Sequence, residues 1–495
     1  MIEFNKFYVT TAIDYVNAEP HIGHAYQKIV ADVLARWNKI KGKTVFFLTG
    51  TDEHGKKVAE SAQKAGKTPK AFVDEISKKF EESWIALNLD FDRFIRTTDK
   101  DHEKTVIEFV DKINKAGDIY KGKYSGWYCV GCERYYTETE LPDKICPDHK
   151  KPLEKISEEA YFFRLSKYQD FLLDLYEKNK DFFLPVERRN EMINRVKEGL
   201  QDLCITRSAM EWGIPFPLDK SHVIYVWFDA LINYYTAVNN KDMIKFWPAD
   251  VHLLGKDNGW FHAIIWPAML KSAGIEVPKT VFIHGFLSFN GSKMSKSLGN
   301  VVSPKTLVEK YGADTIRYYC LRQIPFGEDG DFSEQALIDR HNSELADSLG
   351  NLVNRVLVLV EKNFDGKVPE RHGDENLNTV ALGTVKNYER DMENYQFHHA
   401  LQHVFFLVSE ANKYINENKL WEVKDKEKLG GFLYELLESL RFTAILLYPF
   451  MPETAEKILE QLGLEKKFQF KDLEWGKLSP LKKINRGEVL FKKIK

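Results

Sequence analysis

The chain has 495 residues, of which 43% are hydrophobic and 29% are charged, and its formal net charge is −2. This length exceeds one ordinary domain, so about two to four domains are expected, and the near-neutral charge excludes a protein that is basic throughout. Residues 1–6 do not read as a signal peptide, and no apolar run is long enough to span a membrane. The sequence therefore predicts a cytoplasmic protein with no membrane association.

The first predicted element is a buried strand at residues 7–12, a run of apolar and β-branched residues. A polar turn and a long helical pattern follow, beginning with His21, Gly23 and His24. The start of a helix offers free N–H groups and a positive dipole end, so this strand, turn and helix suit a phosphate group. His21 and His24 share a face and can donate to phosphoryl oxygens, although two surface histidines beside a turn remain an alternative.

A second buried strand is predicted at residues 44–49, and Asp52 follows it. Further strand candidates lie at residues 223–226, 251–254 and 281–284. Strands that alternate with helices predict a doubly wound α/β fold with a parallel sheet. Because ligands bind beyond the carboxyl ends of such strands, Tyr15, the histidine turn and Asp52 are expected around one crevice.

The alternation is interrupted between residues 116 and 215, where cysteines occur in a metal-ligand pattern. Cys129 and Cys132 form one pair, and Cys146 and His149 form a second pair after thirteen intervening residues. Three thiolates and one imidazole at this spacing predict one structural Zn²⁺ with no open position. A disulfide is disfavoured in a cytoplasmic chain, and unrelated buried cysteines are the other alternative.

Two aromatic clusters follow strand candidates in the second half of the sheet. Trp227, Ala230 and Tyr234 recur at helical spacing, and Phe261 and His262 stand in the second cluster, which also contains Trp260 and Trp266. Aromatic residues at such spacing usually belong to the hydrophobic core. On the same sheet edge as the nucleotide crevice they also suit a pocket for an apolar, polarizable side chain.

Residues 291–300, GSKMSKSLGN, place Lys293 and Lys296 among small polar residues between glycines. This composition predicts a mobile cationic loop, or alternatively an ordinary solvated turn. Beyond about Asp331 the chain becomes helical, with apolar stripes such as Leu345, Leu349, Leu352, Val356 and Leu359. Several helices of this kind predict an all-α bundle.

The histidine turn HIGH and the lysine loop KMSKS, in this order, resemble the signatures of class I aminoacyl-tRNA synthetases. The resemblance narrows to the methionyl-tRNA synthetases with a single zinc knuckle and covers essentially the whole chain. The matching passages are residues 12–17, 50–55, 129–149, 227–230, 255–257 and 293–297. Two positions depart from the family pattern, because Asn258 replaces an apolar residue and Leu420 replaces a proline.

This resemblance implies a Rossmann-type catalytic core with a zinc-knuckle connective insertion, followed by an anticodon-binding helical bundle. The implied parts are a first catalytic half at 1–115, the insertion at 116–215, a second catalytic half with the lysine loop at 216–330, the bundle at 331–478 and a tail at 479–495. Relatives that dimerise often do so through an appended barrel domain, so a monomer is expected here.

The resemblance also implies residue roles. Asp52 would hold the methionine ammonium group. The methionine side-chain pocket would consist of Ile13, Tyr15, Trp227, Ala230, Leu231, Tyr234, Phe261, His262 and Trp266. ATP would contact His21, Gly23, His24, Gly255, Asp257, Lys293 and Lys296, among which the two histidines and the two lysines would be catalytic. The anticodon would be read by Asn351, Arg355 and Trp421, since unpaired bases are recognised by stacking and side-chain hydrogen bonds.

The implied activity is that of a methionine–tRNA ligase. L-methionine would react with ATP and Mg²⁺ to give methionyl-adenylate, and the methionyl group would pass to the 3′ adenosine of tRNA(Met) for initiation and elongation. Related enzymes for leucine, isoleucine and valine carry a large editing insertion, because one methylene discriminates by only about 1–3 kcal/mol. Residues 116–215 are too few for such a domain, which favours methionine.

Three other interpretations stay open on the sequence alone. A free-standing nucleotidylyltransferase would adenylylate its substrate without needing RNA. A zinc-ribbon nucleic-acid-binding module with a decayed enzyme core would bind RNA but would not exchange pyrophosphate. A cysteine-specific enzyme of the same class would hold its zinc in the amino-acid pocket.

Overall fold

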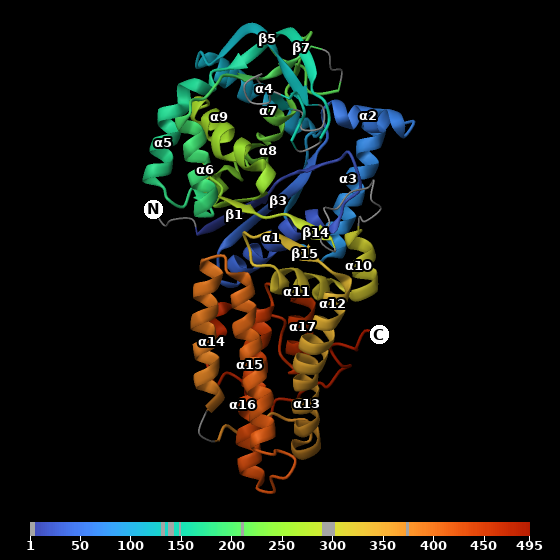
Figure 1. Ribbon diagram of the computed structural model, residues 1–495. Coiled ribbons are helices and arrows are strands. Elements are labelled where there is room, and N and C mark those ends of the chain that lie inside the picture. The colour runs from blue at the N-terminus through green and yellow to red at the C-terminus, as the bar shows by residue number, and fades with distance from the viewer. Residues whose placement is uncertain are drawn as a thin grey trace. The chain divides into compact units, whose positions relative to one another are not determined.

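The computed structural model describes residues 5–129, 134–136, 143–147, 150–208, 212–289, 302–372 and 376–495. The chain divides into two compact units. The first, called the sheet unit below, comprises residues 1–31, 45–85 and 90–284, and the second, called the helical unit, comprises residues 32–44, 86–89 and 285–495. Figure 1 shows the elements of both.

The described residues of the sheet unit are built on a seven-stranded sheet whose order is β2-β3-β1-β12-β13-β8, with β4 also paired to β3. Strand β1 runs parallel to β12, β12 to β13 and β13 to β8, and β3 runs parallel to β2 and to β4. The strands are β1 (Lys6–Thr11), β2 (Asp14–Tyr15), β3 (Thr44–Asp52), β4 (Arg93–Arg96), β8 (Phe183–Leu184), β12 (Val251–Gly255) and β13 (Thr280–His284). The predicted parallel sheet with helices is therefore confirmed.

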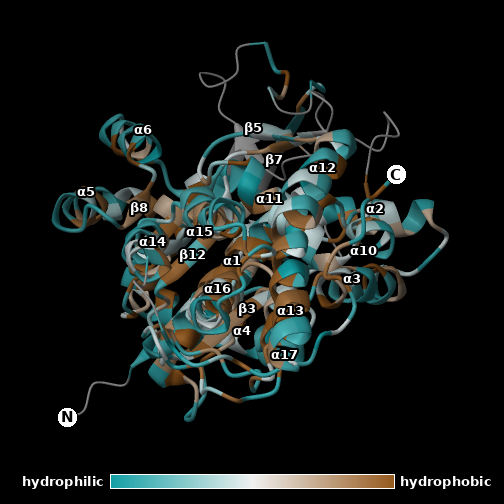
Figure 2. Cartoon of the chain, turned by 90° about the horizontal axis from the view of Figure 1, so that it is seen from below, coloured by the Kyte–Doolittle hydropathy of each residue, from teal (hydrophilic) through white to brown (hydrophobic). Residues whose placement is uncertain are grey.

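Strands β1, β3 and β12 are buried over nearly their whole length. Continuous burial is typical of parallel strands covered on both faces, and Figure 2 draws β3 and β12 largely in the hydrophobic colour. At Gly50 in β3, an added Cβ would lie 1.9 Å from the carbonyl oxygen of Ile95 in β4. Only glycine therefore permits this pairing of β3 with β4.

Helices connect and cover these strands. They are α1 (Ile22–Ile40), α2 (Lys56–Lys64), α3 (Pro69–Ala86), α4 (Lys100–Lys115), α5 (Gln169–Lys178), α6 (Val186–Lys197), α7 (Val226–Ala230), α8 (Asn233–Thr236) and α9 (Trp266–Ser272), with a π-helical segment η4 at Phe261–Ile265. Helix α1 contributes residues 22–31 to the sheet unit and 32–40 to the helical unit. Its predicted start after the histidine turn is confirmed.

One predicted strand takes a different place. The strand candidate at 223–226 forms β11 (Val223–Ile224), which pairs antiparallel with β10 (Thr206–Arg207) and does not join the main sheet. The main sheet instead gains β2, β4 and β8, which the sequence did not predict. Strand β8 has two residues, and β4 reads Arg-Phe-Ile-Arg, so neither carries a long apolar run. Strand β8 also lies inside the range 116–215.

A second sheet of the sheet unit has the order β6-β5-β7-β9 and is antiparallel. Its strands are β5 (Ile119–Cys129), β6 (Arg134–Tyr136), β7 (Glu154–Phe163) and β9 (Leu203–Cys204). Strands β5 and β7 form a long antiparallel pair, called the β5–β7 hairpin below. Their register runs from Ile119 opposite Phe163 to Tyr128 opposite Glu154. Cys129 therefore stands at the far end of this hairpin.

The helical unit contains α10 (Pro304–Tyr311), α11 (Ala313–Gln323), α12 (Glu334–Arg340), the π-helical η6 (His341–Gly350), α13 (Asn351–Phe364), α14 (Asn376–Glu393), α15 (Phe397–Glu417), α16 (Lys426–Leu447) and α17 (Pro452–Gln461). The unit also contains a short parallel pair of strands, β14 (Leu287–Phe289), which precedes α10, and β15 (Gly330–Phe332), which lies between α11 and α12. The predicted helical C-terminal region is confirmed. Helices α13, α14 and α15 each pack against α16.

The predicted apolar stripe of this unit is buried at Leu345, Leu349, Leu352 and Val356. Leu359 is only half-buried, and Leu357 and Val360 are buried in its region instead. The stripe begins in η6, whose π-helical i→i+5 turns are wider than those of an α-helix. Within the regular helix α13 the buried face is centred on Leu352, Val353, Val356, Leu357 and Val360, so Leu359 lies at its border.

Arg317 of α11 is completely buried in the helical unit. Its Nη2 donates to Asp32 Oδ2 at 2.6 Å and to the Pro449 carbonyl at 2.9 Å, and its Nε donates to the Phe450 carbonyl at 2.8 Å. This guanidinium therefore joins α11, the second half of α1 and the segment that follows α16.

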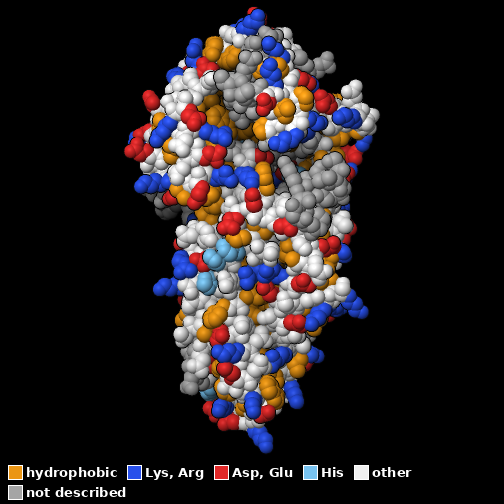
Figure 3. Space-filling view, in the orientation of Figure 1, with side chains coloured by type: hydrophobic (Ala, Val, Ile, Leu, Met, Phe, Trp, Pro, Cys, Tyr) orange, Lys and Arg blue, Asp and Glu red, His pale blue; other side chains and the backbone are white. Residues whose placement is uncertain are grey.

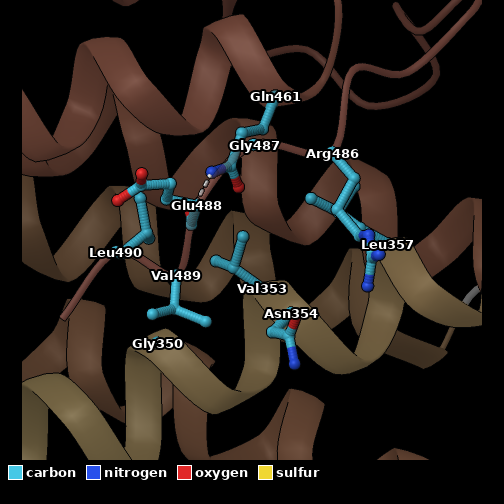
Figure 4. Close-up of a pocket in the computed structure, with 10 residues that line it drawn as sticks. All are labelled: Gly350, Val353, Asn354, Leu357, Gln461, Arg486, Gly487, Glu488, Val489 and Leu490. Atoms are coloured by element: carbon cyan, nitrogen blue, oxygen red, sulfur yellow. Dashed lines mark hydrogen bonds between the residues drawn. The ribbon is translucent and has the colours of Figure 1, made fainter. Parts of the chain in front are cut away.

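The C-terminal segment from about residue 479 belongs to the helical unit. Side-chain amides of that unit hold it through hydrogen bonds to its backbone. Asn342 donates to the Ile494 carbonyl and accepts from the Ile494 N–H, and Gln461 Nε2 donates to the Glu488 carbonyl at 2.8 Å. Figure 4 shows this second contact beside α13.

No helix among the described residues has both the length and the apolar character that a membrane crossing requires. Figure 3 shows Lys and Arg interspersed with Asp and Glu over the visible face.

Candidate active site

The histidine turn lies where the sequence predicted it, at the start of α1. The backbone N–H of His21 donates to His24 Nδ1 at 3.2 Å, and the two rings stack with centroids 3.8 Å apart. Burial, followed by the nearby His21 and Lys28, lowers the pKa of His24 well below its ordinary value. His24 is therefore a neutral imidazole whose Nδ1 accepts, so its proton is on Nε2 and can be donated to an anionic group.

Tyr15 and Asp52 come together through the strand register. Tyr15 in β2 stands opposite Asp52 at the end of β3, and the Val16 N–H donates to the Asp52 carbonyl at 3.1 Å. Asp52 is buried and Tyr15 is half-buried, with the Lys57 ammonium 6.0 Å from the Tyr15 ring centroid. A carboxylate and a phenol ring thus lie side by side at the carboxyl edge of the sheet, as expected.

The two aromatic clusters form one wall in the sheet unit. Trp227 of α7 stacks on Phe261 of η4, with ring centroids 3.7 Å apart and planes 6° from parallel. Tyr234 and His262 join the clusters through a hydrogen bond of 2.7 Å between Tyr234 Oη and His262 Nε2. Ala230 and Leu231 lie buried between these residues along the chain, and Ile13 packs against the same core.

His262 is a neutral, oriented imidazole. Its Nδ1 donates to the Asn258 carbonyl at 3.0 Å, so its Nε2 accepts from the Tyr234 hydroxyl. Burial lowers the pKa of His262 to about 4. Asn258 serves His262 through its backbone, and its own side chain contacts Asp257 Oδ1 at 3.3 Å. The departure from the family pattern at Asn258 therefore leaves the His262 contact intact.

Trp266 supports this wall from behind. It is fully buried, and its Nε1 donates to His252 Nε2 at 3.3 Å. His252 Nδ1 then donates to Thr10 Oγ1 at 2.6 Å, and the pKa of His252 is lowered well below its ordinary value by burial and by His262. Sequence reasoning missed His252, although a lone histidine within the apolar strand β12 was the signal that could have identified it.

A second buried group that sequence reasoning missed is Asp229 of α7. His54 Nδ1 and His102 Nε2 each lie 2.7 Å from one of its two carboxylate oxygens. Burial disfavours the charged carboxylate, but the two histidines hold the pKa of Asp229 below its ordinary value. The cluster ties the loop that follows Asp52 to the helix that carries Trp227 and Ala230.

Gly255 and Asp257 stand at the carboxyl end of β12, which pairs with β1. An added Cβ at Gly255 would lie 2.8 Å from Asp257 Oδ1, so the backbone and this carboxylate approach closely. Both residues lie on the same sheet edge as the β1–β2 segment and the start of α1. Lys293 and Lys296 lie outside the described residues.

Of the four predicted zinc ligands, the structure describes Cys129 and Cys146. Both are buried in one small cluster with Leu153, and a tight turn follows Cys146, where the Lys150 N–H donates to the Cys146 carbonyl at 2.8 Å. Cys132 and His149 lie outside the described residues. Within the part of the chain that the structure describes, no group of three or more candidate ligands could hold a metal. The burial of Cys129 and Cys146 in one cluster fits the predicted metal.

The three predicted anticodon residues belong to the helical unit. Arg355 Nη2 donates to Asn416 Oδ1 at 2.8 Å, which brings α13 to the end of α15, and Asn351 is exposed one turn earlier. Trp421 lies just beyond α15 and is 58% exposed, whereas the preceding Leu420 is 1% exposed. Leu420 therefore anchors this segment in the core while Trp421 faces solvent.

Family models match nearly the whole chain. The model described as "tRNA synthetases class I (M)" matches residues 7–155 and 140–357, and the model described as "Anticodon-binding domain of tRNA ligase" matches residues 374–493. Two overlapping matches thus cover both the sheet and the first helices that follow it.

Curated relatives and solved structures agree with this assignment. A methionine–tRNA ligase of Caldanaerobacter subterraneus is 50% identical over 99% of this chain and 79% of its own length, and one of Thermotoga maritima is 48% identical over 99% and 80%. Methionyl-tRNA synthetase of Mycobacterium tuberculosis in complex with methionyl-adenylate has a TM-score of 0.94 and 42% identity over 98% of this chain and 99% of that chain. The chain belongs to the methionine–tRNA ligase family of class I aminoacyl-tRNA synthetases.

Proposed function

We propose that the chain activates L-methionine with ATP and transfers the methionyl group to the 3′ end of tRNA(Met). The observation that carries this proposal is the pairing of Asp52 and Tyr15 with the neutral Tyr234–His262 wall on the sheet edge that also bears the histidine turn. A carboxylate suits an ammonium group, and aromatic rings beside a neutral imidazole suit an uncharged thioether.

The amino-acid site consists of Asp52 and the pocket residues assigned by resemblance. His262 cannot provide a charge at neutral pH, because its pKa is lowered to about 4 by burial, and its Nδ1 proton is already donated to Asn258. The pocket therefore offers dispersion contacts and the Tyr234 hydroxyl, with no cationic group of its own at His262. This environment favours a polarizable apolar side chain over a charged one.

The first reaction needs alignment rather than a base. One carboxylate oxygen of methionine attacks the α-phosphorus of ATP, and the bond to the departing pyrophosphate breaks. His24 donates its Nε2 proton to a phosphate oxygen as negative charge develops, and His21 lies stacked beside it. Gly23, Gly255 and Asp257 hold the nucleotide, and Lys293 and Lys296 neutralise the phosphates. Mg²⁺ bound with ATP supplies further charge neutralisation.

In the second reaction a ribose hydroxyl of the terminal tRNA adenosine attacks the methionyl carbonyl and releases AMP. The class of the enzyme implies the 2′ hydroxyl. Asn351, Arg355 and Trp421 read the anticodon in the helical unit. The exposed Trp421 ring supports this role, because an exposed aromatic face is what an unpaired base stacks on.

The zinc site completes the proposal. One Zn²⁺ bound by Cys129, Cys132, Cys146 and His149 stabilises the far end of the β5–β7 hairpin and takes no part in the reaction. The domain division proposed is 1–115, 116–215, 216–330, 331–478 and 479–495. The main parallel sheet draws six strands from 1–115 and 216–330, which supports a catalytic core in two halves, and the range 116–215 adds the two-residue edge strand β8. A cytoplasmic location and a monomeric state stay predictions.

ATP–pyrophosphate exchange, measured with each of the twenty amino acids, tests the proposal. Exchange that depends on methionine alone, followed by charging of tRNA(Met), is expected. Lys296→Ala should lower exchange by about two orders of magnitude or more while methionine binding persists, since it removes charge stabilisation at the phosphates. Exchange with cysteine, or adenylylation that needs no amino acid, would refute the assignment.

A further inference from the structure

Lys28 is a fully buried lysine on the helix that begins with the histidine turn. Its Nζ donates to Asp14 Oδ1 at 2.6 Å, to the Ala12 carbonyl at 3.1 Å and to Gln27 Oε1 at 3.0 Å. The Trp84 ring closes the remaining side, with its centroid 5.7 Å from the ammonium. All three donor positions of the ammonium are therefore used, and two of them bind the β1–β2 segment.

These contacts join the two halves of the proposed site. Lys28 lies four residues after His24 and seven after His21, so the three share one face of α1. Ala12 and Asp14 alternate along the chain with Ile13 and Tyr15, which belong to the methionine pocket. A single ammonium group thus connects the phosphate-binding turn with the methionine-binding segment.

Stability alone does not account for this pair. Burial raises the pKa of Asp14 to about 6 and lowers the pKa of Lys28, although each group favours the charged form of the other. A buried ion pair of this kind is commonly replaced by apolar residues without loss of stability. A fold that needed only packing here would be served as well by methionine and leucine.

The charge of Asp14 also reaches the pocket. Burial first, and then Asp52 and Asp14, raise the pKa of the Tyr234 phenol. Two carboxylates therefore lie near the wall that would receive methionine, and Lys28 compensates the charge of one of them. This leaves Asp52 as the carboxylate suited to the substrate ammonium group.

We propose that Lys28 and Asp14 are positioning residues that fix the histidine turn relative to the methionine pocket, so that the methionine carboxylate and the α-phosphorus of ATP meet in line. The inference rests on the proposed function. Small errors in alignment lower the rate of such a reaction far more than they lower the binding of either substrate.

The decisive variant is Lys28→Met/Asp14→Leu, which removes both charges together and so leaves neither one buried without the other. Its midpoint of thermal unfolding should stay within about 4 °C of the parent's, as expected for an apolar replacement. Its kcat for ATP–pyrophosphate exchange should fall by about 10- to 100-fold, while the Kd for methionine, measured by equilibrium dialysis, changes little. The single variant Lys28→Met should lose both stability and exchange.

Two further variants separate positioning from general stability. Lys6 on β1 offers a matched control, because its Nζ also binds a partly buried aspartate, Asp250, and the carbonyls of Phe246 and Pro248, but at the opposite end of the strand. Lys6→Met should keep its exchange kcat once folded. Asp14→Asn should retain exchange within about threefold, because its amide oxygen still accepts from Lys28.

Unchanged exchange kcat in the double variant would overturn the inference, as would a loss in Lys6→Met equal to that in the double variant. A loss in Asp14→Asn as large as in the double variant would also overturn it. Should the double variant fail to fold, the kcat of the folded fraction of Lys28→Met decides, measured beside its Kd for methionine and compared with Asp14→Asn. Only Lys28→Met breaks the connection, so a kcat equal to that of Asp14→Asn would overturn the inference. Absence of methionine-dependent exchange in the parent protein would instead refute the proposed function.

Discussion

Truncation of Trp421 to alanine tests the helical unit independently of the sheet unit. Trp421 is 58% exposed, and Leu420 beside it is 1% exposed, so the segment keeps its anchor when the indole is removed. Little stability should be lost. Stacking of one base on an aromatic ring is worth about 1–3 kcal/mol, which corresponds to a loss of about 5- to 160-fold in kcat/KM for tRNA charging.

The assay compares two reactions of the same variant. Charging of tRNA(Met) should fall by the stated factor, and ATP–pyrophosphate exchange without tRNA should stay unchanged. Phe406→Ala is the matched control, since Phe406 is also an exposed aromatic of the helical unit at 54% and has no proposed role in anticodon binding. Equal losses in both reactions would indicate a folding defect, and an unchanged charging rate would remove Trp421 from anticodon recognition.

Three other outcomes follow from the buried groups. Arg317→Met should lower the free energy of unfolding by about 3–5 kcal/mol in urea denaturation, because the buried Asp32 loses one of its two arginine partners and the carbonyls of Pro449 and Phe450 lose a buried donor. Burial lowers the pKa of His262 to about 4, so the unfolded chain binds a proton first as pH falls below about 6.5, and stability should decrease by up to about 3 kcal/mol between pH 6.5 and 4. Native mass spectrometry should find one zinc, and chelation should destabilise the hairpin that carries Cys129 and Cys146.

For each of these three predictions, one result would contradict the reasoning. Arg390→Met, at an exposed arginine, should cost less than about 1 kcal/mol, so an equal loss at both arginines would contradict the buried-charge argument. His262→Gln should flatten the acid decline, and an unaltered slope would assign the proton uptake elsewhere. A folded, active protein that contains no zinc would eliminate the metal.

Much of this architecture was predictable because its main strands and helices correspond to continuous local patterns of apolar and polar residues in the sequence. Strands β1, β3, β12 and β13 are apolar runs, and α1 follows a turn with two spaced histidines. By contrast, β4 and β8 are short or carry charged residues, so only pairing with a longer neighbour makes them strands. The spacing of the apolar stripe likewise predicted Leu352 and Val356 as buried, but it could not tell Leu359 from the neighbouring Leu357 and Val360, which the packing buries instead.

The residues of the candidate site also fall into two groups, those that stand within sequence motifs and those that only the fold brings together. Asp52, Tyr15 and His262 stand within recognisable motifs, so their types and positions pointed to them. The Asp229 cluster joins residues that are 127 and 175 positions apart, and the partner of Lys28 is fourteen positions away across a turn. No periodicity links such residues, because the sheet brings them together only after it has folded. Their role was therefore invisible before the strand order was known.

The π-helical segment η4 carries two residues of the aromatic wall, Phe261 and His262. The Trp266 N–H donates to the Phe261 carbonyl, five residues earlier, while the Asn258 carbonyl receives the side chain of His262. The Asn258 carbonyl thus selects the tautomer of His262 that turns a bare nitrogen toward Tyr234. Because the selecting group is a backbone atom, the polarity of this wall is set by the path of the main chain and does not depend on the side chain at position 258.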